Sequence, residues 1–174
     1  MYLHQGQWHY SPSDLTLFMQ SPFASHMQRL AVEQPQWKDK QDSSDALMQL
    51  LAKQGLQQEQ HIEQRLLAQG KQLCHIDSRL SQAQQWQQSL EAMQQGVDVI
   101  VQARLQLPPF AGYSDYLIKV EHAPGQADSH LGAYHYQVAD SKLANNVKAE
   151  FIIQLCCYAQ MLEAIQGIRP EHFI

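Results

Sequence analysis

The sequence of 174 residues predicts an α/β fold, in which helices flank a central mixed β-sheet. Runs rich in β-branched and aromatic residues, which are typical of strands, alternate with runs that carry apolar residues at helical spacing. Two strand-like runs, 112–118 and 138–143, enclose a turn-rich segment at 123–129, and this arrangement favours a hairpin. The length predicts one domain, 1–174, which we divide into a helical cover at 10–43 and an α/β core at 44–174.

The helical cover begins with a strong helix start. Ser11 can cap a helix at 11–20, Pro12 suits its first position and Asp14 can close a capping box. Pro22 restarts the chain into a second helical run through Arg29. We expect these helices chiefly to pack against the core.

The sequence of the first half of the core predicts a long helix, a short strand and a second helix. The long helix spans 44–69, is interrupted by Gly55 and ends at Gly70. Its apolar stripe contains Leu47, Leu50, Leu51, Ile62, Leu66 and Leu67. The short strand lies near 72–76, and the second helix runs from Ser81 to Gln95 and ends at Gly96.

A strand at 97–107 is expected next, stopped by Pro108 and Pro109. Its alternating pattern predicts one buried face and one polar face. The buried face comprises Val97, Val99, Val101, Ala103 and Leu105, and the polar face comprises Asp98, Gln102 and Arg104.

The final helix is expected to start after the cap residues Asn145 and Asn146 and to stop at Gly167. Its core stripe at helical spacing is Val147, Phe151, Leu155, Tyr158, Leu162 and Ile165. Cys156 and Cys157 are expected to be small core residues.

The predicted hairpin brings two acids together. Residues directly opposite in an antiparallel hairpin have a constant sum of residue numbers. Pairing Asp115 with Asp140 puts the tip at 127–128, inside the turn-rich segment, so the two acids can be cross-strand neighbours. Their Cβ atoms would then lie roughly 5 Å apart. Side chains alternate along a strand, so Asp140 and Lys142 share a face while Ser141 points away.

Two unpaired carboxylates so close would repel, and one would tend to keep its proton. A divalent cation relieves this repulsion, and oxygen ligands suit Mg²⁺ or Mn²⁺. Lys142 would then be close enough to hold a water or a developing negative charge beside the metal. The alternative is an Asp–Lys pair on a solvated surface, which contributes little.

Composition bounds the function. The formal net charge of −5 and the pI near 5.9 argue mildly against nucleic-acid binding, although a metal-binding acid cluster would itself contribute negative charge. Three cysteines make no convincing disulfide framework, which suits a reducing cytoplasm. The N-terminus lacks the pattern of a signal peptide, and no apolar run is long enough for a membrane span. We therefore expect a soluble cytoplasmic protein.

The order of these residues resembles the signature of the PD-(D/E)XK nuclease superfamily, an Asp followed by (Asp/Glu)-x-Lys. Gly112-x-x-Asp115-x-Leu117 and Asp140-x-Lys142 carry the likeness. Gln154 and Tyr158 match the Gln-x-x-x-Tyr motif of its RecB-like branch. The likeness extends from about residue 10 to the end of the chain, and the ordered set is more specific than Asp-x-Lys alone.

The resemblance implies a restriction-endonuclease-like core and an Mg²⁺- or Mn²⁺-dependent deoxyribonuclease, acting in DNA repair, recombination or processing. Asp115, Asp140 and the Ser141 carbonyl would bind the metal, with Glu59, one turn beyond Gly55, as a further ligand. His61 is the second choice for that ligand. Lys142 would orient the attacking water or stabilise the transition state.

The resemblance also implies that Gln154 and Tyr158 contact DNA. No iron–sulfur cluster is expected, because Ser21 stands where the cluster-binding members have their N-terminal cysteine. His172 to Ile174 would begin the closing strand of the core, so the chain is expected to be the front piece of a longer protein, in some relatives one with a helicase domain.

Two rival interpretations remain open. One is a catalytically inactive nucleic-acid-binding or docking module of a larger helicase-linked protein. The other is an unrelated helical interaction protein, suggested by the glutamine-rich helices.

Overall fold

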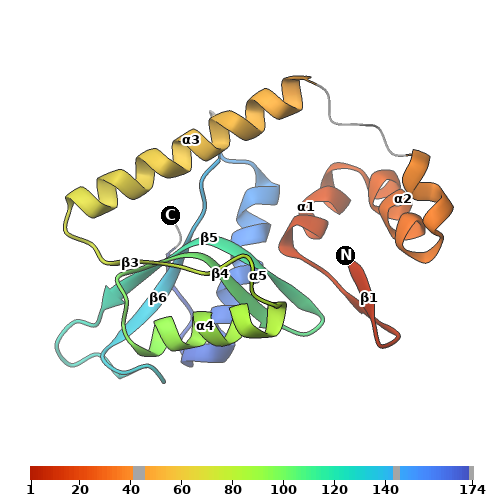
Figure 1. The fold of residues 1–174 in the computed structure, drawn as a ribbon. Coiled ribbons are helices and arrows are strands. Elements are labelled where there is room, and N and C mark those ends of the chain that lie inside the picture. The colour runs from red at the N-terminus through yellow and green to blue at the C-terminus, as the bar shows by residue number, and fades with distance from the viewer. Residues whose placement is uncertain (41–45, 143–145, 173–174) are drawn as a thin grey trace.

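A four-stranded mixed sheet forms the centre of the computed structural model, which describes residues 1–40, 46–142 and 146–172. The strands are β3 (Leu73–His75), β4 (Val99–Leu107), β5 (Phe110–Glu121) and β6 (Tyr134–Ala139). They lie side by side in chain order, with β3 parallel to β4 and the other two pairs antiparallel. The predicted α/β class and mixed sheet are confirmed (Figure 1).

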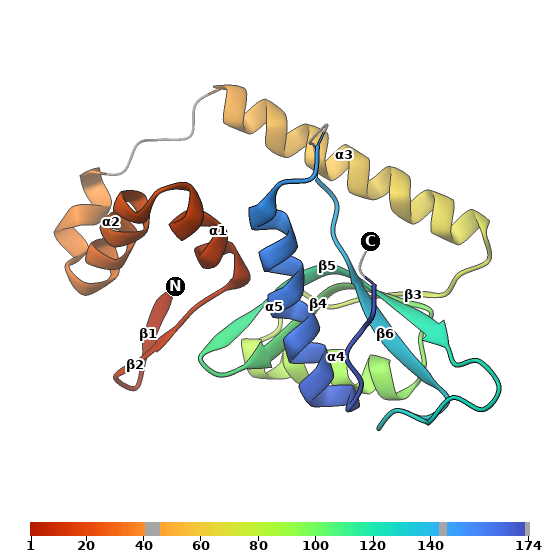
Figure 2. The ribbon, with the colours of Figure 1, turned by 180° about the vertical axis from the view of Figure 1, so that it is seen from behind.

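Helices cover the two sides of this sheet. They are α3 (Ala46–Ala68), α4 (Gln82–Gln94) and α5 (Ala149–Gln166). On one side Ile62 and Leu66 of α3 pack against a small cluster that contains Val99, Val101 and Tyr116. On the other side α4 and α5 share a larger cluster with the sheet, so the core is built from three layers (Figures 1 and 2).

An N-terminal unit lies beside α5. It contains β1 (Tyr2–His4), β2 (Gln7–His9), α1 (Pro12–Gln20), α2 (Pro22–Glu33) and the 3-10 helix η1 (Pro35–Lys40). Two backbone bonds attach it to the sheet: Tyr10 N donates to the Pro109 carbonyl and Ala111 N to the Tyr10 carbonyl, each at 2.9 Å. Figure 2 shows α1 next to α5.

The capping prediction for α1 is confirmed. The Ser11 hydroxyl accepts from Asp14 N at 3.3 Å, and the Asp14 carboxylate accepts from Ser11 N at 2.7 Å. Pro12 is the first residue of α1. The next helix, α2, continues four residues beyond the expected end at Arg29. The β1/β2 hairpin has no counterpart in the prediction.

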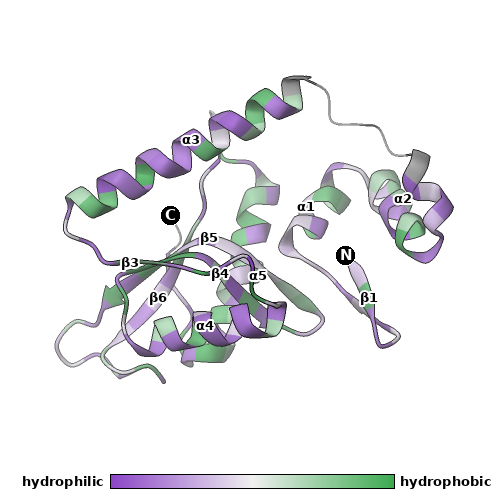
Figure 3. Ribbon diagram, in the orientation of Figure 1, coloured by the Kyte–Doolittle hydropathy of each residue, from purple (hydrophilic) through white to green (hydrophobic). Residues whose placement is uncertain are grey.

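The long helix α3 differs from its prediction in two ways. Gly55 does not interrupt it, because a glycine inside a helix costs only about 1 kcal/mol and α3 is 23 residues long. Leu50, Leu51 and Leu67 are exposed. The N-terminal part of α3 extends past the sheet, so its apolar residues have no strand to cover (Figures 1 and 3).

The prediction of a polar face on β4 is wrong. Arg104 is only 4% exposed and Ile100 is fully buried, because helices cover both sides of the sheet. Alternation between apolar and polar residues is typical of a sheet with one solvent-exposed face, whereas this strand is buried on both faces.

The second hairpin strand lies earlier in the chain than predicted. β6 ends at Ala139, so Asp140 is the first residue after the strand. Lys142 is also outside it, and 143 lies outside the described residues. The aromatic Tyr134 and Tyr136, rather than the acidic segment, form the strand interior because they can bury large rings against the sheet.

The last helix also begins later than expected. Lys148 is the N-cap of α5 and makes no side-chain capping bond, so Asn146 is not the cap and Val147 is 80% exposed outside the helix. Asn145 lies outside the described residues. The stop at Gly167 is confirmed by its left-handed backbone. Cys157 is buried as expected, but Cys156 is exposed because it points to the outer side of the helix.

Gln166, the final residue of α5, fastens that helix to the sheet edge. Its buried side-chain amide accepts from Tyr136 N at 2.8 Å and donates to the Tyr136 carbonyl at 3.1 Å. Tyr136 belongs to β6, the outermost strand. The amide therefore satisfies both backbone groups of an edge residue.

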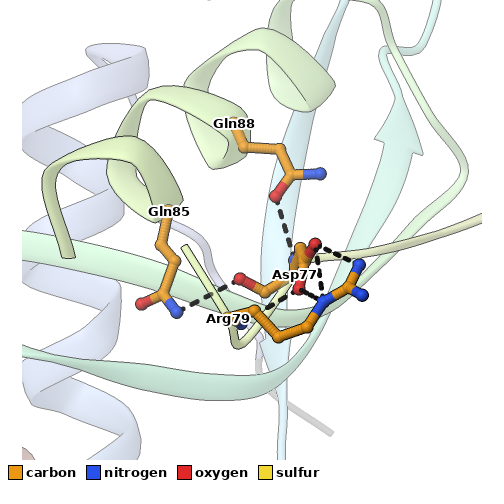
Figure 4. Close-up of polar contacts among 4 residues, drawn as sticks. All are labelled: Asp77, Arg79, Gln85 and Gln88. Carbon is orange, nitrogen blue, oxygen red and sulfur yellow. Dashed lines mark hydrogen bonds and ion pairs between the residues drawn. The ribbon is translucent and has the colours of Figure 1, made fainter. Parts of the chain in front are cut away.

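A polar network holds the connection between β3 and α4 (Figure 4). Gln85 donates to the Asp77 carbonyl at 3.2 Å, and Gln88 accepts from Asp77 N at 3.0 Å. Arg79 forms an exposed ion pair with the Asp77 carboxylate at 2.7 Å. That bond holds the pKa of Asp77 down, at about 2. Gln85 also bonds the Tyr113 hydroxyl, which ties α4 to β5.

Candidate functional site

The hairpin register places Asp115 opposite Asp140. Tyr116 pairs with Ala139 and Leu117 with Val138, which is the register predicted from the sequence. Asp140 follows directly after β6, and the Ser141 amide then donates to Asp115 Oδ2 at 3.0 Å. The backbone after the strand is therefore anchored to the first acid.

Asp140 is a buried acid with a like-charged neighbour. Its side chain is 5% exposed. Burial, followed by the neighbouring Asp115 carboxyl, raises the pKa of Asp140 to about 6, and the nearby Lys142 opposes this rise. Asp140 therefore keeps its proton to a higher pH than an ordinary aspartate does.

Lys142 is the positive group of this cluster. Its Nζ lies 2.7 Å from Asp140 Oδ2, and its side chain is 35% exposed. Lys142 is thus the partner of this buried oxygen among the described residues, and a bound cation would share the carboxylate with the ammonium.

Glu59 approaches the same cluster from α3. Burial, followed by the charges of Asp115 and Glu63, raises the pKa of Glu59, and Lys142 lowers it. The Tyr116 hydroxyl donates to the Glu59 carbonyl at 3.3 Å, which fixes this turn of α3 above β5. The predicted position one turn beyond Gly55 therefore faces the acidic pair.

The predicted metal ligands do not form a complete set. Among the residues that the structure describes, no three His, Cys, Asp or Glu side chains are grouped so that they could hold an ion. His61, the second choice, is exposed. Asp115 and Asp140 fit one side of a metal site because the register places them opposite each other, while Glu59 as a third ligand stays a prediction.

Gln154 and Tyr158 lie behind the acids rather than in the open. Gln154 is 8% exposed and Tyr158 is 2% exposed. The Tyr158 hydroxyl donates to the Tyr113 carbonyl at 2.5 Å. Their expected contact with DNA stays a prediction, and the bond of Tyr158 supports the β5 backbone two residues before Asp115.

Gly112 allows this close packing. A Cβ atom at that position would lie 2.7 Å from Pro12 Cδ and 3.0 Å from the Tyr158 hydroxyl. Only a residue without a side chain lets α1 and α5 approach β5 here. This gives a steric reason for the glycine three residues before Asp115.

Three further features near the site were missed by the sequence analysis. Glu63 lies one turn beyond Glu59 and 3.5 Å from His75 Nε2; its spacing from Glu59 was the available signal. Gln102, between the paired residues Val101 and Ala103, has a φ of 55°. Residues other than glycine rarely adopt this backbone conformation, which costs about 1–3 kcal/mol and tends to occur at functional sites.

The third missed feature is a cavity of about 260 Å³ between α3 and the β5/β6 hairpin. Its wall is largely apolar, with Ile62 and Leu66 on the helix and Tyr116 on the sheet, and Asp140 and Ser141 also line it. Arg65 is its basic residue. Asp140 thus borders a cavity that could accept part of a ligand.

The comparisons add no relative. No protein-family model matches the chain, and neither a curated protein nor a solved structure matches it significantly. Within the described part of the chain, no helix is long and apolar enough to cross a membrane.

Proposed function

We propose that this protein is a cytoplasmic, Mg²⁺- or Mn²⁺-dependent nuclease that hydrolyses phosphodiester bonds of DNA. The observation that carries the proposal is the position of Asp115 opposite the buried Asp140, with the Lys142 ammonium 2.7 Å from Asp140 Oδ2. A buried acid beside a second carboxyl is costly for the fold. Such a cost is expected where the pair serves binding or catalysis.

The donor set suits a hard divalent cation. Asp115, Asp140 and the Ser141 carbonyl would hold it, with Glu59 as the further ligand. The metal would supply charge neutralisation at the scissile phosphate and a more acidic bound water.

The remaining groups would act on the water and the phosphate. Lys142, partly exposed, would orient the water or stabilise negative charge as it develops. Tyr158 and Gln154 would keep the β5 backbone in place, and their buried position favours this role over a direct grip on the substrate.

A cleavage assay tests the proposal. Single- and double-stranded DNA are incubated with Mn²⁺ and the wild type, Asp140→Ala or Lys142→Ala, and Lys53→Ala, an exposed lysine of α3, serves as the control. We expect cleavage by the wild type and the control and at least a hundredfold loss in the two site variants. Equal cleavage by all four proteins, or none by any, refutes the nuclease.

A binding module without catalysis is the alternative, and one observation favours it. The described residues lack a third metal ligand in place, and Lys142 already neutralises Asp140. In that case DNA would bind without being cut, and a helicase-linked partner would supply the activity.

A further inference from the structure

A second cavity, of about 550 Å³, lies away from the acidic pair. Three parts of the chain line it: the β1/β2 hairpin, the first turns of α4, and the ends of β4 and β5. None of its lining residues is acidic, although the protein as a whole carries a formal charge of −5. The cavity therefore differs in charge from the rest of the molecule.

Arg104 is the cation that lines this cavity. It is 4% exposed, and its Nε is a buried donor without a hydrogen-bond partner. Its Nη2 donates to Gln82 Oε1 at 3.1 Å, and its guanidinium lies 5.2 Å from the centre of the Tyr113 ring. No carboxylate of the described residues forms an ion pair with it.

A buried guanidinium stays charged at any ordinary pH, and an unpaired buried charge is costly. A neutral amide and a ring face compensate only part of this cost. The start of α4, a helix of 13 residues, adds the positive end of its dipole, because Ser81 and Gln82 also line the cavity. Both features favour an anion, and the planar guanidinium suits the oxygens of a phosphate.

The other walls favour a flat ring. Trp86 and Phe110 line the cavity, each also packed against the larger hydrophobic cluster. Tyr2 lines it from the hairpin, where its ring is stacked on His9 with centres 5.0 Å apart. Rigid aromatic walls bind nucleobases by stacking, and 550 Å³ lies within the range of roughly 300–1,000 Å³ for small-molecule sites.

We propose that this cavity binds a nucleotide, with the 5′-phosphate at Arg104 and the base between the aromatic walls. The phosphate would come from a free mononucleotide or from the end of a DNA strand. The inference does not depend on the nuclease proposal, because none of the acidic pair lines this cavity.

Calorimetric titration of the full chain with dAMP, in EDTA, tests the site. We expect saturable binding by the wild type, at least tenfold weaker binding by Arg104→Met, and unchanged binding by Arg79→Met. Arg79 is the matched control, since it is an arginine near the same helix whose guanidinium is exposed and paired with Asp77. No saturable binding at millimolar dAMP, or equal affinity in Arg104→Met, overturns the proposal.

Two further titrations keep the test decisive if Arg104→Met fails to fold. Deoxyadenosine, which lacks the phosphate, should bind the wild type at least tenfold more weakly than dAMP, and equal affinity would refute the role of Arg104. Asp140→Asn should bind dAMP as the wild type does, whereas a loss there would place the nucleotide at the acidic pair and overturn the assignment.

A final pair of ligands identifies the source of the phosphate. Tenfold tighter binding of a 5′-phosphorylated tetranucleotide than of its 5′-hydroxyl form supports a strand end. Binding of dAMP with no binding of either tetranucleotide supports a free mononucleotide.

Discussion

Replacing Asp140 with asparagine should stabilise the folded protein at pH 8. The folded-state pKa of Asp140 is raised from 3.8 to about 6, so the carboxyl is ionised in the folded state at a cost that the unfolded chain does not bear. At about 1.4 kcal/mol for each pH unit, this cost reaches about 3 kcal/mol above pH 6. The figure already includes the attraction of Lys142, and an amide can still donate to Asp115.

The gain should depend on pH. The stabilising effect of a protonated Asp140 is fully present below pH 3.8 and is lost as the pH rises through about 6. The variant should therefore exceed the wild type by up to about 3 kcal/mol at pH 8 and by almost nothing at pH 4.

Urea denaturation of both proteins at pH 4 and pH 8, in EDTA, measures this difference. Asp98→Asn is the control with the opposite sign: Asp98 accepts from Gln72 N at 3.0 Å, and this bond with its other partners lowers its pKa. Removing the Asp98 carboxylate should therefore reduce the free energy of unfolding at pH 8. A variant Asp140→Asn that is no more stable than the wild type at pH 8, or equally improved at both pH values, refutes the reasoning.

The remaining predictions concern packing, support and metal. Gly112→Ala should lower the free energy of unfolding by about 1–3 kcal/mol, because its Cβ would overlap Pro12, whereas Gly55→Ala, with open space around it, should raise it by about 0.5–1 kcal/mol; thermal denaturation of both variants measures the contrast, and equal effects contradict it. Tyr158→Phe should lower the free energy of unfolding by about 1–2 kcal/mol, because the Tyr113 carbonyl loses its donor. If Tyr158 only supports the fold, any DNA cleavage that this variant loses should be recovered on cooling. Mn²⁺ should raise the melting temperature of the wild type but not of a variant lacking both Asp115 and Asp140, and equal shifts would exclude these ligands.

Much of the hairpin could be predicted from the sequence. The turn-rich segment fixed where the chain reverses, and the reversal point determines which residues face each other. This is why the register of Asp115 and Asp140 is confirmed although the expected limits of the second strand are not. A strand limit depends on which side chains find tertiary partners, as Tyr134 and Tyr136 do, and local composition does not contain that information.

The surroundings of the site were less accessible to sequence reasoning. Glu63 approaches Tyr116 only because α3 crosses the sheet, and the left-handed Gln102 has no compositional signal. The burial of Arg104 follows from a helix on the second face of the sheet, which alternation along one strand cannot reveal. Local patterns thus predicted the helices and turns better than the partners of each polar group.

The double bond between Gln166 and Tyr136 has a consequence for self-association. An exposed outer strand offers its N–H and C=O groups to any passing chain, which is the usual start of sheet-to-sheet aggregation. Here the Gln166 side chain bonds both backbone groups of Tyr136 in β6, so a second molecule cannot pair with the backbone of that residue. Gln166 therefore opposes strand-to-strand association along this edge.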